Sequence, residues 1–199
     1  MRRIRFGTIG DVHEAFPALA EAVAPTAPDE PPIEHVERLG RAGRLADAIA
    51  VFAFLLPRRE AVWWGCRCVM SAGDVVEASD RRSWAIAANW VRSPDEQRRR
   101  AALEDGETAA QSRPTTWLVR AAAWSGGSMV PAEAGTVLPP PDLTARALRA
   151  GLSISLGVHS QEKAALERTF VDHGLEIALA ETDLADDLAE FQKRLIAKG

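Results

Sequence analysis

Histidine and cysteine are the residues of this sequence that could carry out metal, acid–base or nucleophilic chemistry. The four histidines are His13, His35, His159 and His173. No two of them have the H-x-x-x-H or H-E-x-x-H spacing that places two imidazoles on one helix face for a zinc ion. We therefore predict no metal site, no cofactor and no catalytic residue, and we expect the histidines to be packed or to lie at helix ends.

Cys66 and Cys68 lie two residues apart on a predicted helix, so they point to nearly opposite sides and cannot easily form a disulfide. A nucleophilic thiol would need a nearby cation such as Arg59 or Arg67. Both cysteines lie in the middle of the helix, where the helix dipole does not favour a thiolate. We predict buried, reduced thiols, which suit a cytoplasmic protein.

The segment Ser125-Gly126-Gly127-Ser128 has the composition of a backbone nest for an anion. Phosphate-binding loops normally precede a helix, whereas this segment follows the predicted helix that ends at Trp124. A helix cap followed by a flexible turn is the better interpretation.

Arg58, Arg59 and Glu60 occupy the predicted first turn of the helix that carries Trp63 and Trp64. The helix dipole disfavours cations there, so the two arginines must have partners. One hypothesis gives them acidic side chains, carbonyl oxygens or tryptophan rings within the fold. The other makes this motif a docking site for a partner, with arginine and tryptophan as anchors.

The segments that must position these residues carry apolar side chains at the spacing of a helix. Ile49, Phe52, Ala53 and Leu56 recur at i, i+3, i+4 and i+7, and Pro57 ends this helix and can open the next. This arrangement predicts a corner between two antiparallel helices. Apolar positions at helical spacing recur in segments 63–70, 84–91, 117–124, 148–152, 166–177 and 184–195.

Prolines and capping residues predict several helix boundaries. Ser93 can cap a helix that has Pro94 in its first turn, Pro114 can open another helix, and Asp142 can cap a third. The segment from residue 94 to about 111 is largely polar, and its three arginines at 98–100 lie between Glu96 and the glutamates at 104 and 107. We therefore expect it to cover the outside of the fold.

Taken together, the pattern predicts an all-α protein, a compact bundle of antiparallel hairpins with about seven or eight helices. Residues 33–199 form one domain, and residues 1–32 form an N-terminal segment and a proline-rich linker. In that segment Ile4 and Phe6 could begin a short strand, and residues 10–23 could form a helix interrupted at Pro17. One long loop is expected at residues 125–142, because residues 130–142 contain four prolines and one glycine. The tryptophans are expected to converge in the core.

Composition excludes several classes of function. The net charge is −4, with 28 acidic against 24 basic residues, so a broad nucleic-acid surface is not expected. The longest apolar run, residues 48–56, is too short to span a bilayer, which needs about 20 residues. Met1-Arg2-Arg3 is followed by charged residues instead of the apolar region of a signal peptide, so we expect a cytoplasmic protein without membrane insertion.

Three motifs together resemble an uncharacterised bacterial protein family over roughly residues 40–150. They are Leu-Pro-Arg-Arg-Glu-Ala-Val-Trp-Trp at 56–64, Trp-Ser-Gly-Gly-Ser at 124–128, and Pro-Pro-Pro-Asp-Leu-Thr-Ala-Arg at 139–146. Members of this family are often encoded beside type VI secretion genes. The resemblance implies a cellular context, and it carries no catalytic residues over to this sequence.

Two functions remain open at this point. The first is a non-catalytic accessory protein, an adaptor, chaperone or immunity-like binder, whose protein partner is a secretion component or an effector. The residues proposed for partner binding or for structure are Arg58, Arg59, Glu60, Trp63, Trp64, Trp124, Ser125, Gly126 and Gly127. The alternative is a small hydrolase-like enzyme with a histidine or cysteine site near the loop at 125–142.

Overall fold

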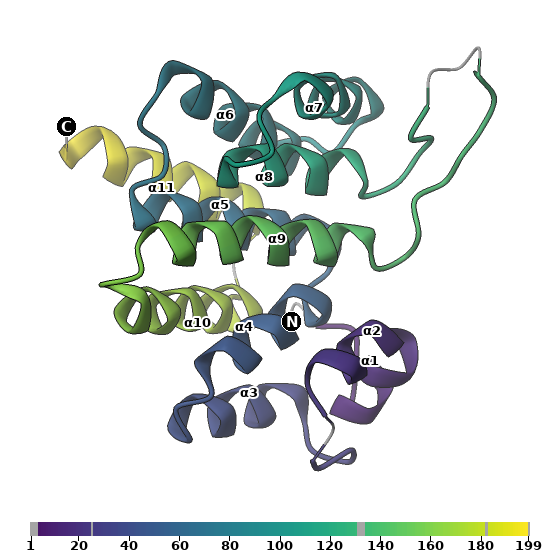
Figure 1. Cartoon of the computed structure of the whole chain (residues 1–199), viewed down its shortest axis with the longest axis vertical. Coiled ribbons are helices and arrows are strands. Elements are labelled where there is room, and N and C mark those ends of the chain that lie inside the picture. The colour runs from purple at the N-terminus through teal and green to yellow at the C-terminus, as the bar shows by residue number, and fades with distance from the viewer. Residues whose placement is uncertain (1–3, 25, 131–133, 182, 199) are drawn as a thin grey trace.

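The computed structural model of this protein describes residues 4–24, 26–130, 134–181 and 183–198. Throughout these residues the regular structure is helical, which confirms the all-α prediction (Figure 1). The described part contains eleven helices, more than the expected seven or eight. They are α1 (Ile9–Ala15), α2 (Pro17–Ala22), α3 (Pro32–Arg41), α4 (Leu45–Leu55), α5 (Arg58–Ala72), α6 (Ala78–Arg92), α7 (Glu96–Thr108), α8 (Pro114–Ala123), α9 (Leu143–Val158), α10 (Lys163–Leu179) and α11 (Leu184–Lys198).

Prolines set the helix boundaries largely as expected. Pro57 separates α4 from α5, and its φ of −55° suits the position immediately before a helix. Pro114 is the first residue of α8, where its missing N–H leaves no hydrogen bond unmade. Pro17 begins α2 and thereby divides the N-terminal region into two short helices, which accounts for part of the higher helix count.

Two capping predictions are wrong. The residue before α7 that caps it is Asp95, whose carboxylate accepts from the backbone N–H of Arg98 at 2.8 Å, so Pro94 precedes the helix instead of lying in its first turn. Asp142 occupies the N-cap position of α9, but its backbone is helical (φ −94°, ψ −3°) and its side chain makes no capping hydrogen bond; its carboxylate accepts from Nε of Arg146 at 2.6 Å.

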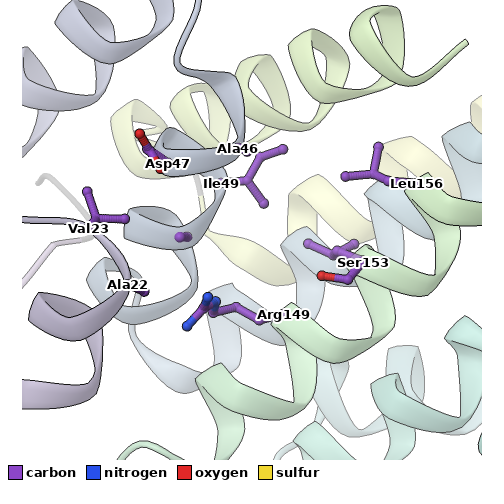
Figure 2. Close-up of a pocket in the computed structure, with 10 residues that line it drawn as sticks. Ala22, Val23, Ala46, Asp47, Ile49, Arg149, Ser153 and Leu156 are labelled. Carbon is purple, nitrogen blue, oxygen red and sulfur yellow. The ribbon is translucent and has the colours of Figure 1, made fainter. Parts of the chain in front are cut away.

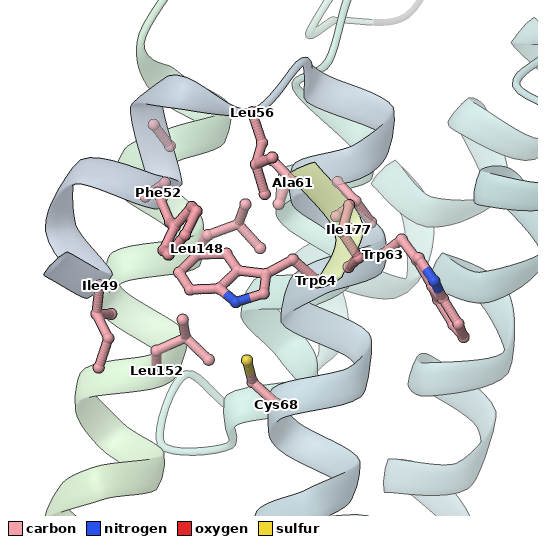
Figure 3. Close-up of a cluster of buried hydrophobic side chains, with 14 of the residues drawn as sticks. Ile49, Phe52, Leu56, Ala61, Trp63, Trp64, Cys68, Leu148, Leu152 and Ile177 are labelled. Carbon is pink, nitrogen blue, oxygen red and sulfur yellow. The ribbon is translucent and has the colours of Figure 1, made fainter. Parts of the chain in front are cut away.

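Helix α5 lies at the centre of the fold and packs against α6, α8, α9 and α10. Trp63 and Trp64 of this helix are both fully buried. The indole of Trp64 lies among side chains of α4 and α9, including Phe52, Leu148 and Leu152 (Figure 3). Its N–H donates to the carbonyl oxygen of Phe170 in α10 at 2.8 Å, so this large side chain is buried without an unpaired polar atom.

The other tryptophans follow the predicted inward arrangement in part. Trp84 and Trp90 are buried, and the N–H of Trp84 donates to the carbonyl oxygen of Cys66 at 2.9 Å. Trp117 and Trp124 are only half-buried. The guanidinium of Arg120 lies 5.0 Å and 5.9 Å from the centres of these two rings, a cation–π arrangement at the edge of the core.

The N-terminal segment packs on the rest of the fold through its helices. Ile9, Val12 and Leu19 are buried in the same hydrophobic core as α4 and α5. The short strand considered for Ile4 and Phe6 does not form in the described residues; the Phe6 ring instead packs edge-on against Phe16 at 6.0 Å. Residues 1–3 and 131–133, which entered the expectations about export and about the long loop, lie outside the described residues.

In the part of the chain that the structure describes, no helix is both long enough and apolar enough to cross a membrane.

Candidate functional site

The motifs that stand out in the sequence meet at one corner of the fold, where α5 begins. Arg58 donates from Nη1 to the carbonyl oxygen of Ser125 at 2.6 Å and from Nη2 to that of Pro141 at 3.2 Å. One guanidinium therefore ties together the two ends of the loop at residues 125–142. Burial lowers the pKa of Arg58, and the nearby charge of Arg5 lowers it further.

Arg59 binds the end of a different helix. Its Nε donates to the carbonyl oxygen of Val91 at 2.6 Å, and its Nη2 to that of Arg92 at 3.3 Å, both in the last turn of α6. A cation is favoured at a helix C-terminus, so these contacts offset the cost of placing an arginine in the first turn of α5. Glu60 lies half-buried in the same first turn, where the dipole favours an acid.

These contacts show how the structure places the arginines of the sequence motif. Both side chains bind carbonyl oxygens, one of the partner types considered, and neither forms an ion pair with a carboxylate among the described residues. The indoles of Trp63 and Trp64 lie inside the core and not at the surface of this corner. Trp124, by contrast, caps the end of α8 and remains half-buried beside the loop.

A second arginine cluster on α7 binds the first half of the same loop. Arg99, only 4% exposed, donates to the carbonyl oxygens of Ala123 at 2.8 Å and Ser128 at 3.0 Å. Arg100 donates to that of Val130 at 2.9 Å. We name residues 125–142 the clamped loop, because Arg58, Arg99 and Arg100 bind its backbone.

Glu96 holds the arginines of α7 in position. Its carboxylate accepts from Nε and Nη2 of Arg99, each at 2.7 Å, and from Nε of Arg100 at 2.8 Å. These hydrogen bonds, from Arg99 first, lower the pKa of Glu96 to about 2. The arginines at 98–100 were expected on the outside of the fold, and for Arg99 this prediction is wrong. The i, i+3 and i, i+4 spacing from Glu96 was the signal that could have revealed the cluster.

Gly127 is required where Arg99 crosses the loop. Its φ is 63°, a left-handed conformation that favours glycine. A Cβ atom at this position would lie 2.7 Å from Nε of Arg99, so any other residue would collide with the guanidinium. Gly126 has no such neighbour within 4 Å. The turn presents carbonyl oxygens to cations, which is the opposite polarity to an anion nest.

Hydrogen bonds join the two arms of the clamped loop. The N–H of Met129 donates to the carbonyl oxygen of Val137 at 2.8 Å, and the Ser128 hydroxyl accepts from the N–H groups of Val130 and Val137, each at 3.2 Å. The described parts of the loop extend past the ends of α8 and α9 (Figure 1). Val137 and Leu138, on the arm that returns to α9, are 46% and 66% exposed, and these surface apolar residues were not among the candidates from the sequence.

A family model for a family of unknown function, DUF6931, matches residues 35–178. The chain belongs to this family. The match contains α4 to α9, the arginines of the clamp and the whole clamped loop, whereas α1, α2 and α11 lie outside it. No curated protein and no solved structure matches the chain.

Within the DUF6931 match, the cysteines and histidines lie away from the clamped loop. Cys66 and Cys68 are fully buried in α5, and burial raises the pKa of both thiols. His159 lies just after the last residue of α9, at the opposite end of this helix from the clamped loop. Its Nε2 lies 2.9 Å from the carboxylate of Asp74. Among the described residues no cluster of three or more histidine, cysteine, aspartate or glutamate side chains could hold a metal ion.

His173 lies beside a hydroxyl group, the pairing that would activate a serine nucleophile, since its Nε2 lies 2.8 Å from the Ser71 hydroxyl. Its Nδ1 lies 2.9 Å from Nη2 of Arg67, and a guanidinium can only donate. The neutral ring must therefore accept at Nδ1 and carry its proton on Nε2, so it donates to Ser71 and cannot take the hydroxyl proton. Burial, and then the charge of Arg67, lower the pKa of His173 and favour this neutral form.

Proposed function

We propose that this protein is a non-catalytic, cytoplasmic accessory protein that binds a protein partner through the clamped loop. The observation that carries the proposal is the loop's anchoring. Arginine side chains bind its backbone near both ends, while Val137 and Leu138 remain exposed between them. Loop segments that are already held by hydrogen bonds lose little entropy on binding, so the exposed apolar side chains of Val137 and Leu138 can contribute more of their burial energy to affinity.

The chemistry of the site supports binding over catalysis. Each guanidinium of the clamp already donates to backbone carbonyl oxygens or to Glu96. The buried thiols of Cys66 and Cys68 have raised pKa values and are therefore poor nucleophiles. The hydrolase-like alternative needs a histidine or cysteine beside the loop, and the carboxylates that do lie there, Glu96 and Asp142, are each paired with arginine.

The resemblance to a family often encoded beside type VI secretion genes suggests the partner. We infer an adaptor, chaperone or immunity-like binder whose partner is a secretion component or an effector. The roles of Arg58 and Arg59 in this proposal are structural, because their hydrogen bonds lie within the fold. Those of Arg58 position the loop, and those of Arg59 bind the end of α6.

The test is affinity capture from the native host with the full-length protein and with Leu138→Asp. The matched control is Val158→Asp, since Val158 is 67% exposed and Leu138 is 66% exposed, and Val158 lies at the far end of α9 from the loop. We expect the wild type and Val158→Asp to recover a secretion-apparatus subunit or an effector and Leu138→Asp to lose it. Equal recovery by all three proteins would refute the role of the loop, and turnover of a substrate by the purified protein would refute the non-catalytic assignment.

A further inference from the structure

A cavity of about 210 Å³ lies between α2, α4 and α9, away from the clamped loop. Its buried walls are apolar, and its rim is formed by exposed small residues (Figure 2). An apolar cavity of about 150 Å³ is enough to bind benzene, so this one has room for a small organic molecule. The buried apolar wall consists of Val23, Ile49, Ala50, Leu152 and Leu156.

Arg149 contributes a positive charge to this cavity without a carboxylate partner. Within the described part of the chain it forms no ion pair or hydrogen bond, and its guanidinium lies 6.0 Å from the centre of the Phe54 ring. Figure 2 shows the side chain extending from α9 across the space towards Ala22 of α2. A half-buried guanidinium against apolar walls attracts an anion more strongly than one in open water does.

The other charged residue of the cavity wall is Asp47, and it is already neutralised. Its carboxylate accepts from Nε of Arg44 at 2.6 Å. The charge available to a ligand is therefore that of Arg149. Ser153 lies one turn further along α9 on the same face, so its hydroxyl can donate beside the guanidinium.

We propose that this cavity binds a carboxylate carried on a small apolar body. The carboxylate accepts from the guanidinium of Arg149 and the hydroxyl of Ser153, and the apolar body covers Ile49 and Leu152. A guanidinium and a carboxylate match in geometry, because two parallel N–H groups face two oxygens. The carboxylate can belong to a free small acid or to the C-terminal residue of a peptide.

The experiment is calorimetric titration of the full-length protein with benzoate and, as the neutral analogue of similar size, benzyl alcohol. We expect benzoate to bind at least about tenfold more tightly, because only the carboxylate engages Arg149. Arg149→Met removes this preference. The matched control is Arg146→Met, since Arg146 is on the same helix but pairs with Asp142 outside the cavity and should leave benzoate binding unchanged.

A second variant and a second probe complete the test. Ser153→Trp places a large side chain at the rim and is expected to weaken benzoate binding even if Arg149→Met fails to fold. A tripeptide that ends in phenylalanine is titrated with a free and with an amidated C-terminus. Binding of benzoate assigns the site to free acids, whereas Arg149-dependent binding of the free-acid peptide alone assigns it to chain termini.

The proposal is overturned if neither benzoate nor the free-acid peptide binds, or if both bind Arg149→Met as tightly as the wild type. Circular dichroism melting of each variant shows whether a lost signal reflects a lost fold. These outcomes do not bear on partner binding by the clamped loop, because the cavity and the loop share no residue.

Discussion

Arg58 donates to the carbonyl oxygen of Ser125 at 2.6 Å, although the two residues are 67 positions apart in the sequence. The same guanidinium reaches Pro141 at the other end of the clamped loop. The first turn of α5 therefore fixes where the loop leaves the helical body and where it returns. The position of the exposed residues Val137 and Leu138 depends on this contact.

Replacement of Arg58 is expected to destabilise the fold. Arg58→Ala leaves two carbonyl oxygens without their charged donor, and we expect a loss of about 1–2 kcal/mol in the free energy of unfolding by urea. Arg41→Ala is the control, since Arg41 is 75% exposed and its contact with Glu37 is 3.9 Å long. Exposed pairs of this kind contribute less than about 1 kcal/mol. Unchanged stability of Arg58→Ala with a lost partner would instead make Arg58 a docking residue.

Glu96 is expected to support the clamp down to very low pH. Its pKa of about 2 lies below the ordinary value of 4.5, so the unfolded chain binds the proton first. The stabilisation is complete above pH 4.5 and is lost as the pH falls through about 2. Unfolding of the wild type and of Glu96→Gln, followed from pH 6 to pH 2, should show a stability difference that shrinks with acid. A difference that is independent of pH would contradict this assignment.

Gly174 is expected to tolerate no side chain. A Cβ atom there would lie 2.6 Å from the ring of Phe52, which is fully buried and packs against Trp64. Gly174→Ala should therefore lose about 1–3 kcal/mol, as overpacked cores do. Gly157→Ala, where no atom lies within 4 Å of the new Cβ, should be neutral or stabilising by up to about 1 kcal/mol. Equal effects of the two substitutions in urea unfolding would show that the α10–α4 contact is looser than described.

His13 is expected to make the fold sensitive to mild acid. Burial lowers its pKa below 6.5, and repulsion from His35 lowers it further. As the pH falls below 6.5 the unfolded chain takes up a proton that the folded chain does not, so stability decreases. Both ring nitrogens of His13 are buried without a partner, so His13→Leu should also be tolerated.

The measurement is the melting temperature between pH 8 and pH 5 for the wild type and for His13→Leu. We expect the variant to lose less stability over this range. His13 lies in α1, which packs against α2, so hydrogen exchange of these two helices should rise first in acid. Parallel pH curves for the two proteins would exclude His13 as the titrating group.

The helices and much of the core follow from local physical chemistry, which the sequence contains. The periodicity of Ile49, Phe52 and Leu56 predicted a helix, and Pro57 predicted its end, because the proline ring disfavours the preceding helical turn. The burial of Trp63 and Trp64 follows from their size and apolar surface. Capping was predicted less well, because the backbone of Asp142 is helical and not extended, so its side chain makes no capping hydrogen bond.

The partners of the charged residues could not be predicted in this way. The helix dipole indicated that Arg58 and Arg59 need partners, but the choice of Ser125 and Val91 depends on which helix ends the fold brings beside α5. The burial of Arg99 and the position of Arg149 in a cavity depend equally on neighbours from distant segments. Local sequence decides helices because their hydrogen bonds join residues four apart. The partners of Arg58 and Arg59 lie in distant segments, where only the packed tertiary structure sets distance and burial.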